Sequence, residues 1–82
     1  MKVHILKGQD GDWEGLFING KLISEGHVLG EGNSQMFMLD MAEEYGFKSK
    51  DVFNIVVTDE DDKMLNKTGG FPDNIEELSG NY

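Results

Sequence analysis

The chain has 82 residues, with 16 acidic side chains against 7 basic ones, which gives a formal net charge of −9. At this length we expect a single domain, residues 1–82, whose core leaves little room for a large catalytic cleft. The absence of cysteine excludes a disulfide framework and thiolate metal ligands. The acidic balance, with no arginine at all, disfavours direct binding to nucleic acid.

The ends and the charge of the chain bear on its compartment and its partners. The apolar stretch 1–7 is too short for a signal peptide, and no stretch approaches the length of a membrane span. We therefore expect a cytoplasmic protein that does not bind membranes. The negative charge has two interpretations: it keeps a small domain soluble, or it attracts a protein with a basic surface.

The N-terminal part predicts a three-stranded meander. Residues 2–7 are expected to form a first strand, followed by a polar turn. Two runs that favour β-structure, 13–18 and 21–27, flank Asn19-Gly20. This dipeptide supplies the two positive φ angles that a type I′ hairpin turn requires.

A two-residue turn at this dipeptide implies a register for the hairpin. Ile18 then faces Lys21, and counting back places Glu14 directly across from Glu25. One face is expected to carry Trp13, Phe17 and Leu22, and the other Glu14, Leu16, Ile18, Ile23, Glu25 and His27.

The middle of the chain predicts a helix and a further strand. Apolar residues recur at helical spacing from Ser34 to Tyr45, with Asn33 or Ser34 as the N-cap and Gly46 in the left-handed position that ends a helix. The β-branched run 52–57 follows as a fourth strand. Because both of its faces are apolar, we expect it in a central position, with the helix on one side and the C-terminal part on the other.

The C-terminal part allows two interpretations between Thr58 and Gly70. It forms a short helix with acidic residues in its first turn, or a hairpin that turns at 60–62. Residues 73–78 are expected to add a helical turn packed through apolar side chains, and residues 79–82 to form a frayed tail. The fold class is therefore two-layer α+β, in the order β-β-β-α-β plus a short C-terminal helical segment, with one principal helix on one face of a four-stranded, mainly antiparallel sheet.

The expected hairpin register suggests one chemical constellation. Glu14 and Glu25 would form a like-charge pair with His27 beside them, which is unfavourable unless something compensates. Two carboxylates and an imidazole can bind a divalent metal ion or a small ligand, or act as an acid–base pair. In the simpler interpretation, a lysine or His27 neutralises an exposed pair.

Other catalytic and cofactor motifs are missing from the sequence. The acidic stretches 10–14 and 59–62 lack the glycine and glutamate positions of an EF-hand loop. The glycines do not have the spacing of a phosphate-binding loop, and no serine or cysteine has the context of a nucleophile. We therefore expect a protein that is not an enzyme and that uses no cofactor.

Three stretches, 12–22, 25–27 and 70–78, resemble small uncharacterised proteins of bacteriophages and bacteria. Those proteins carry a D-W-E-G-L-[FY]-x-N-G-K-L-x-x-E-G-H hairpin and a G-x-F-P-x-x-[IL] ending. The resemblance implies a phage or prophage accessory gene, whose product would act in the host cytoplasm. Such a context favours proteins that bind and inhibit a host factor.

Together these patterns predict a small acidic protein-binding module, either a phage-type inhibitor of a host factor or a mimic of nucleic acid. One alternative is a module that binds a small ligand or a divalent metal ion through the two glutamates and the histidine named above. Another is a homodimer that pairs sheet edges. The residues expected to contact a partner are Trp13, Glu14, Glu25, His27, Asp40, Glu43 and Glu44.

Overall fold

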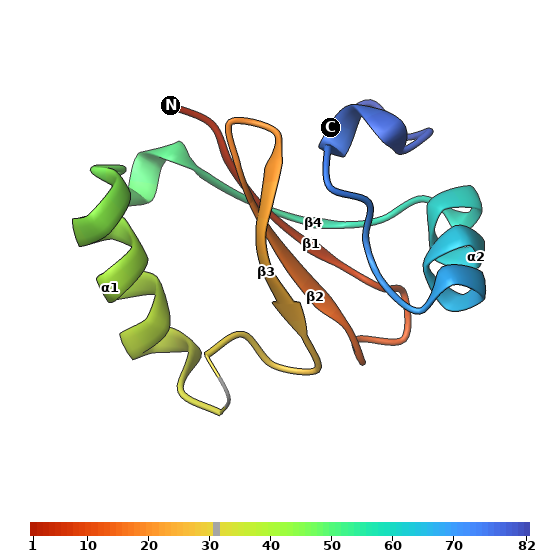
Figure 1. Cartoon of the computed structure of the whole chain (residues 1–82), viewed down its shortest axis with the longest axis horizontal. Coiled ribbons are helices and arrows are strands. Elements are labelled where there is room, and N and C mark those ends of the chain that lie inside the picture. The colour runs from red at the N-terminus through yellow and green to blue at the C-terminus, as the bar shows by residue number, and fades with distance from the viewer. Residues whose placement is uncertain (31) are drawn as a thin grey trace.

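The computed structural model describes residues 1–30 and 32–82. In chain order these residues form β1 (Val3–Lys7), β2 (Glu14–Ile18), β3 (Lys21–Gly26), α1 (Ser34–Tyr45), β4 (Val52–Val56) and α2 (Asp59–Thr68), with 3-10 turns at Ser49–Asp51 and Ile75–Glu77. The two helices lie on opposite sides of the sheet (Figure 1). Neither of them is both long enough and apolar enough to cross a membrane.

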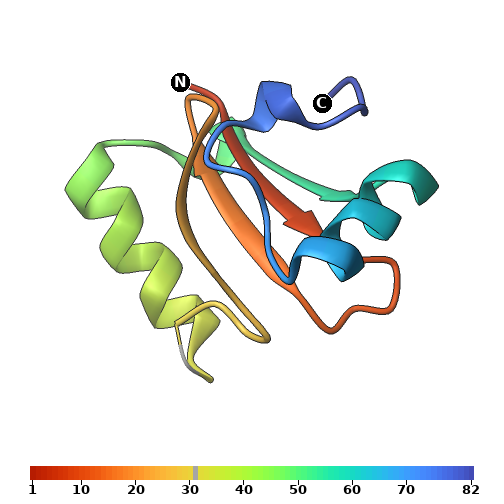
Figure 2. The same ribbon diagram turned by 45° about the vertical axis from the view of Figure 1, so that its right-hand side comes forward.

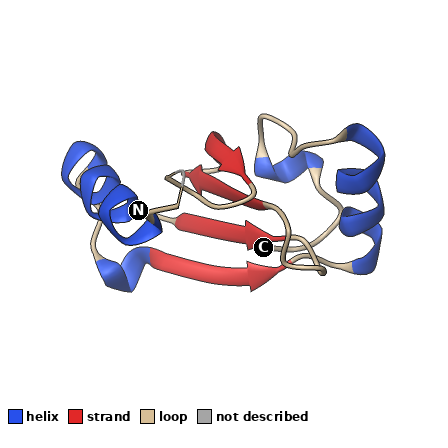
Figure 3. Cartoon of the chain, turned by 90° about the horizontal axis from the view of Figure 1, so that it is seen from below, coloured by secondary structure: helices blue, strands red, loops and turns tan. Residues whose placement is uncertain are grey.

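The four strands form one open sheet in the order β3-β2-β1-β4. The meander β1-β2-β3 is antiparallel, and β4 joins β1 in parallel after the crossover through α1. The predicted α+β class and the mainly antiparallel sheet are confirmed. The central position predicted for residues 52–57 is wrong, because β4 is an edge strand (Figure 3). The two central strands are β2 and β1.

The hairpin turn forms as the sequence predicts, but the register behind it does not. Asn19 and Gly20 have φ angles of 50° and 84°, the two positive values of a type I′ turn. The pairing then shifts by one residue: Leu16 faces Ser24, so Ile23 is an extra, bulged residue of β3. Every β3 residue beyond the bulge is displaced to the opposite face of the sheet from the one we predicted.

One face of the sheet packs against α1. Asn33 caps this helix by accepting a hydrogen bond from the Met36 amide, and Gly46 ends it in the left-handed conformation, as the sequence predicts. The helix buries none of its residues completely, so it covers the sheet with half-buried side chains. The buried core on this face consists of Val3, Ile5, Leu16, Ile18, Leu29 and Phe47.

The second face is covered by α2 and by the chain that follows it. Of the two predicted interpretations the helix is correct: Thr58 caps α2, and Gly69 ends it. The chain then runs back along the hairpin toward its turn (Figure 2), where Ile75 N donates to the Gly20 carbonyl at 2.8 Å. The buried core on this face consists of Leu6, Phe17, Val57, Leu65, Phe71 and Leu78.

The C-terminal residues are held by a buried carboxylate, which differs from the frayed tail that we expected. Asp61 is 2% exposed. Its Oδ1 accepts from Ser79 N at 2.7 Å and from Ser79 Oγ at 2.8 Å, and its Oδ2 accepts from Gly80 N at 2.8 Å and from the Tyr82 hydroxyl. These charge-assisted hydrogen bonds join the first turn of α2 to the end of the chain.

Candidate functional site

The bulge in β3 separates the two glutamates that we expected to find side by side. Glu25 pairs with Gly15 and Glu14 with Gly26, so the two carboxylates lie on opposite faces of the sheet. The predicted pairing of Glu14 with Glu25 is therefore wrong. The bulge removes a like-charge contact that would have been unfavourable across the hairpin.

Glu14 lies on the face of the sheet that α1 covers, where its carboxylate makes two contacts within the fold. Its Oε1 lies 3.4 Å from Lys7 Nζ, and its Oε2 accepts a hydrogen bond from the Leu29 amide at 3.2 Å. The carboxylate thus holds the chain that leaves β3 against the sheet. It does not take part in the cluster around Trp13.

Glu25 lies on the other face and organises the residues there. Its Oε1 accepts hydrogen bonds from Trp13 Nε1 at 2.9 Å and from the Phe71 amide at 2.7 Å. One oxygen therefore joins the start of β2, the end of β3 and the segment after α2. The first of these bonds satisfies the indole N–H, and Trp13 as a whole is half-buried.

His27, which directly follows β3, completes this group. Its Nδ1 donates to the Asp12 carbonyl at 2.9 Å, which leaves Nε2 as an acceptor in the neutral ring. The imidazole meets the Trp13 indole edge-on, with ring centroids 4.9 Å apart. The expectation that His27 lies beside both glutamates is wrong, because it lies on the Trp13 side of the sheet.

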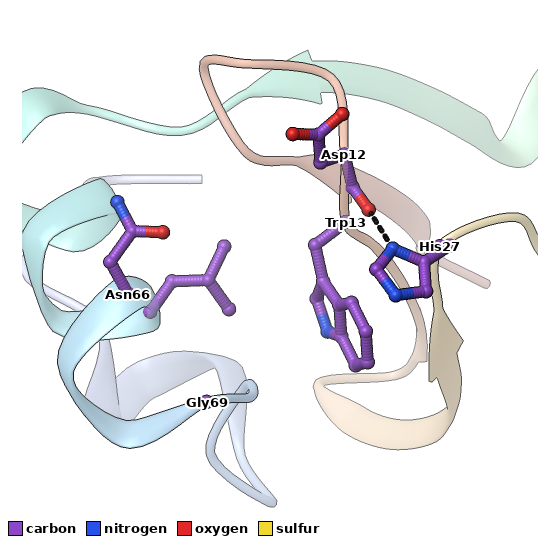
Figure 4. A pocket seen from close by; sticks show the side chains of 6 residues that line it. Asp12, Trp13, His27, Asn66 and Gly69 are labelled. Carbon is purple, nitrogen blue, oxygen red and sulfur yellow. Dashed lines mark hydrogen bonds between the residues drawn. The ribbon is translucent and has the colours of Figure 1, made fainter.

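A hollow of about 290 Å³ opens between this aromatic pair and α2. Figure 4 shows Trp13 and His27 on one wall and Asn66 and Gly69 on the other. A second hollow of about 430 Å³ adjoins it and shares Gly69. The lining residues of the first hollow are Asp12, Trp13, His27, Leu65, Asn66 and Gly69.

The β1–β2 loop, which brings Asp12 to the hollow, is attached to the start of α2. The Gln9 amide donates to Asp62 Oδ1 at 2.9 Å, and Gln9 Nε2 donates to Asp59 Oδ1 at 2.6 Å. The loop also carries Asp10 and Asp12, both exposed. The hollow therefore combines a half-buried aromatic residue with the exposed carboxylate of Asp12, a combination suited to a cationic group.

The remaining predicted contact residues lie elsewhere. Asp40, Glu43 and Glu44 are exposed on α1, which covers the opposite face of the sheet. The predicted partner-binding residues therefore form two separate groups, one on each side of the sheet. The group with Trp13 adjoins a hollow that Trp13 and His27 line.

The donor groups of this site do not form a metal centre. Within residues 1–30 and 32–82, no three histidine, aspartate or glutamate side chains converge as a metal site requires. The ligand set predicted from Glu14, Glu25 and His27 is not assembled, because the first of these lies on the far face.

Sequence reasoning missed the contributions of α2. Leu65, Asn66 and Gly69 line the hollow, and Asp61 fastens the C-terminal residues. Burial raises the pKa of Asp61, but hydrogen bonds from Tyr82, Ser79 and Gly80 outweigh it and lower this pKa from 3.8 to about 2. The Thr-x-x-Asp spacing of a capping box was the one local signal for Asp61.

Comparison with known proteins adds no relative. No protein-family model matches the chain, and neither a curated protein nor a solved structure matches it significantly. The resemblance to phage and bacterial proteins therefore stays a prediction.

Proposed function

We propose that the protein is a non-enzymatic binding module that recognises a basic segment of another protein in the hollow beside Trp13. The observation that carries this proposal is the half-buried indole at the wall of the hollow, with the exposed Asp12 beside it. Aromatic rings in such positions are frequent anchors of protein interfaces. A lysine or arginine side chain would lie against the indole and meet the carboxylate at the same time.

The overall charge supports the same choice of partner. The chain carries a net charge of −9 and no arginine, and the loop that carries Asp12 is attached through Gln9 to Asp59 and Asp62 of α2. Opposite potentials accelerate the encounter of two proteins and suppress wrong partners. We therefore expect binding to weaken steeply as salt is added.

A phage-type inhibitor that mimics nucleic acid is the more specific form of this proposal. In that case the partner is a nucleic-acid-binding protein of the host, and the module acts in the host cytoplasm. The module would then compete with duplex DNA or RNA for that protein. Competition measured by fluorescence anisotropy of a labelled duplex tests this form separately.

The chain has one tryptophan, so its fluorescence reports directly on the hollow. The first experiment titrates the protein with a lysine- and arginine-rich peptide and with an acidic peptide of equal length. We expect a saturable change in the emission of Trp13 with the basic peptide only, reversed by added salt. An unchanged emission with both peptides would contradict the proposal.

The second experiment is affinity capture from a bacterial lysate at low and at high salt. Asp12→Asn should reduce the recovery of the partner, because the side-chain charge is lost while the backbone carbonyl that binds His27 remains. Asp40→Asn makes the same charge change on α1 and should leave recovery unchanged. If only Asp40→Asn reduces it, the binding surface lies on α1 and not at the hollow.

A further inference from the structure

The outer edge of β4 lacks the features that usually prevent sheets from joining. The strand and the residue after it read Val52-Phe53-Asn54-Ile55-Val56-Val57, with no charge and no proline. Natural edge strands are commonly protected by lysine, proline or a bulge. Phe53 is 46% exposed and Val56 is 58% exposed, so this edge presents apolar surface to solvent.

The other edge of the sheet is different. β3 contains the β-bulge, and its hairpin end is covered by the returning C-terminal segment, where Leu22 N donates to the Asp73 carbonyl at 2.8 Å and Lys21 pairs with Asn74. In the part of the chain that the structure describes, no strand pairs with the outer side of β4. The two edges of the sheet are therefore not equivalent.

The backbone of β4 shows which groups point outward. The Val57 amide donates to the Lys7 carbonyl at 2.9 Å, so this residue faces β1. Alternation along the strand then directs the amide and carbonyl groups of Asn54 and Val56 away from the sheet.

We propose that β4 pairs in antiparallel orientation with β4 of a second copy of this chain, around a two-fold axis at Asn54. In this register Asn54 faces its own counterpart, and Val56 faces Val52. Both are pairs of outward-pointing residues, which exchange hydrogen bonds in an antiparallel ladder. The two sheets then become one, and an isologous interface of this kind closes as a dimer.

Charges at the ends of β4 favour this orientation over a parallel one. Lys48 and Lys50 precede the strand together with Asp51, which accepts a hydrogen bond from the Lys48 amide, and Asp59 and Glu60 follow it, so one end is net basic and the other is acidic. Antiparallel pairing brings the basic end of one copy to the acidic end of the other, whereas parallel pairing would place like charges together. This charge complementarity favours a second copy of the chain as the partner, because each end of β4 then lies near an end of opposite charge.

An apolar hollow next to the edge supports the same occupant. About 370 Å³ of space lies between α1 and β4, and Met38, Leu39 and Val52 are among its lining residues. Leu39 is 58% exposed. A second copy seated on β4 would bring its own exposed Leu39 toward this region and remove apolar surface from water.

Sedimentation equilibrium at roughly 0.15 M salt tests the proposal. We expect a species of twice the chain mass of 9.2 kDa. Val56→Lys should give a monomer, while Val28→Lys, the same change at a position 49% exposed and outside the sheet, should leave the dimer intact. Circular dichroism confirms that both variants fold. A monomeric parent protein, or a dimer unaffected by Val56→Lys, overturns the proposal.

A cysteine introduced into this cysteine-free chain tests the register itself. Asn54→Cys places two thiols across the two-fold axis, where directly opposed residues have Cα atoms about 5.5 Å apart, a distance that suits a disulfide. We expect Asn54→Cys to cross-link under mild oxidation much faster than Val28→Cys. Equal rates would exclude the proposed register. Because this edge is separate from the Trp13 hollow, neither result bears on the binding of a basic peptide.

Discussion

Replacing Asp61 by asparagine should destabilise the protein strongly, although the substitution keeps the size of the side chain. Each carboxylate oxygen accepts a hydrogen bond from a backbone amide, one from Ser79 and one from Gly80. In either orientation of the new amide, its NH₂ group lies against a backbone N–H and cannot accept a hydrogen bond from it. A buried donor without a partner costs about 1–3 kcal/mol.

The lowered pKa of Asp61 gives the part of the expected stability loss that depends on pH. Each unit of pKa difference between the folded and unfolded states is worth about 1.4 kcal/mol. A pKa lowered from 3.8 to about 2 therefore corresponds to about 2 kcal/mol of stability at neutral pH. Because the pKa is lowered on folding, this stabilisation is complete above the unfolded pKa and is lost as the pH falls through the folded one.

Urea denaturation followed by circular dichroism measures both effects. We expect the free energy of unfolding of Asp61→Asn to be about 2–4 kcal/mol below that of the parent protein at about pH 6. At about pH 2.5 this difference should be smaller by more than about 1 kcal/mol. Glu60→Gln removes the same charge from an exposed neighbour and should cost less than about 1 kcal/mol. A pH-independent difference, or equal losses in the two variants, would refute the reasoning.

Three further predictions concern the second face of the sheet. Gly15→Ala should cost about 1–3 kcal/mol in chemical denaturation, because the new Cβ would lie 2.5 Å from the Phe71 ring, whereas Gly26→Ala, whose nearest neighbour atom is 3.8 Å away, should cost little. Glu25→Ala should lower the stability by about 1 kcal/mol and alter the tryptophan emission, and the glutamine variant, which keeps an acceptor oxygen, should lose less. Burial, and to a smaller extent a nearby lysine, lowers the pKa of His4 from its unfolded value of 6.5. The unfolded state therefore binds a proton more readily, and the free energy of unfolding should decrease as the pH falls from 6.5. His4→Phe, which also removes a buried nitrogen without a partner among the described residues, should abolish that decline in pH-dependent melting.

The two proposed surfaces can operate together. The Trp13 hollow lies between the base of the hairpin and α2, and the β4 edge lies at the margin of the sheet. A dimer through β4 would present two hollows to one partner or to two. If a partner carries two basic segments at a matching distance, the second binding event becomes intramolecular and the apparent affinity rises.

The candidate site was only partly predictable because its geometry depends on one residue of register. Trp13 was expected on the face that it occupies, since it directly precedes β2 and continues the alternation from Phe17, and the bulged residue lies in β3. Glu25 and His27 follow the bulge at Ile23, so their faces were reversed. A bulge depends on which register packs best over the whole face, and local propensity does not report that.

The sequence by itself determined the features that depend on a few neighbouring residues. The Asn19-Gly20 turn, the cap of α1 at Asn33 and its end at Gly46 follow from backbone preferences and local hydrogen bonds. Only the tertiary structure decided that β4 lies at an edge and that Asp61 is buried. Both are results of contacts between segments far apart in the chain, whose energies are absent from any local window of residues.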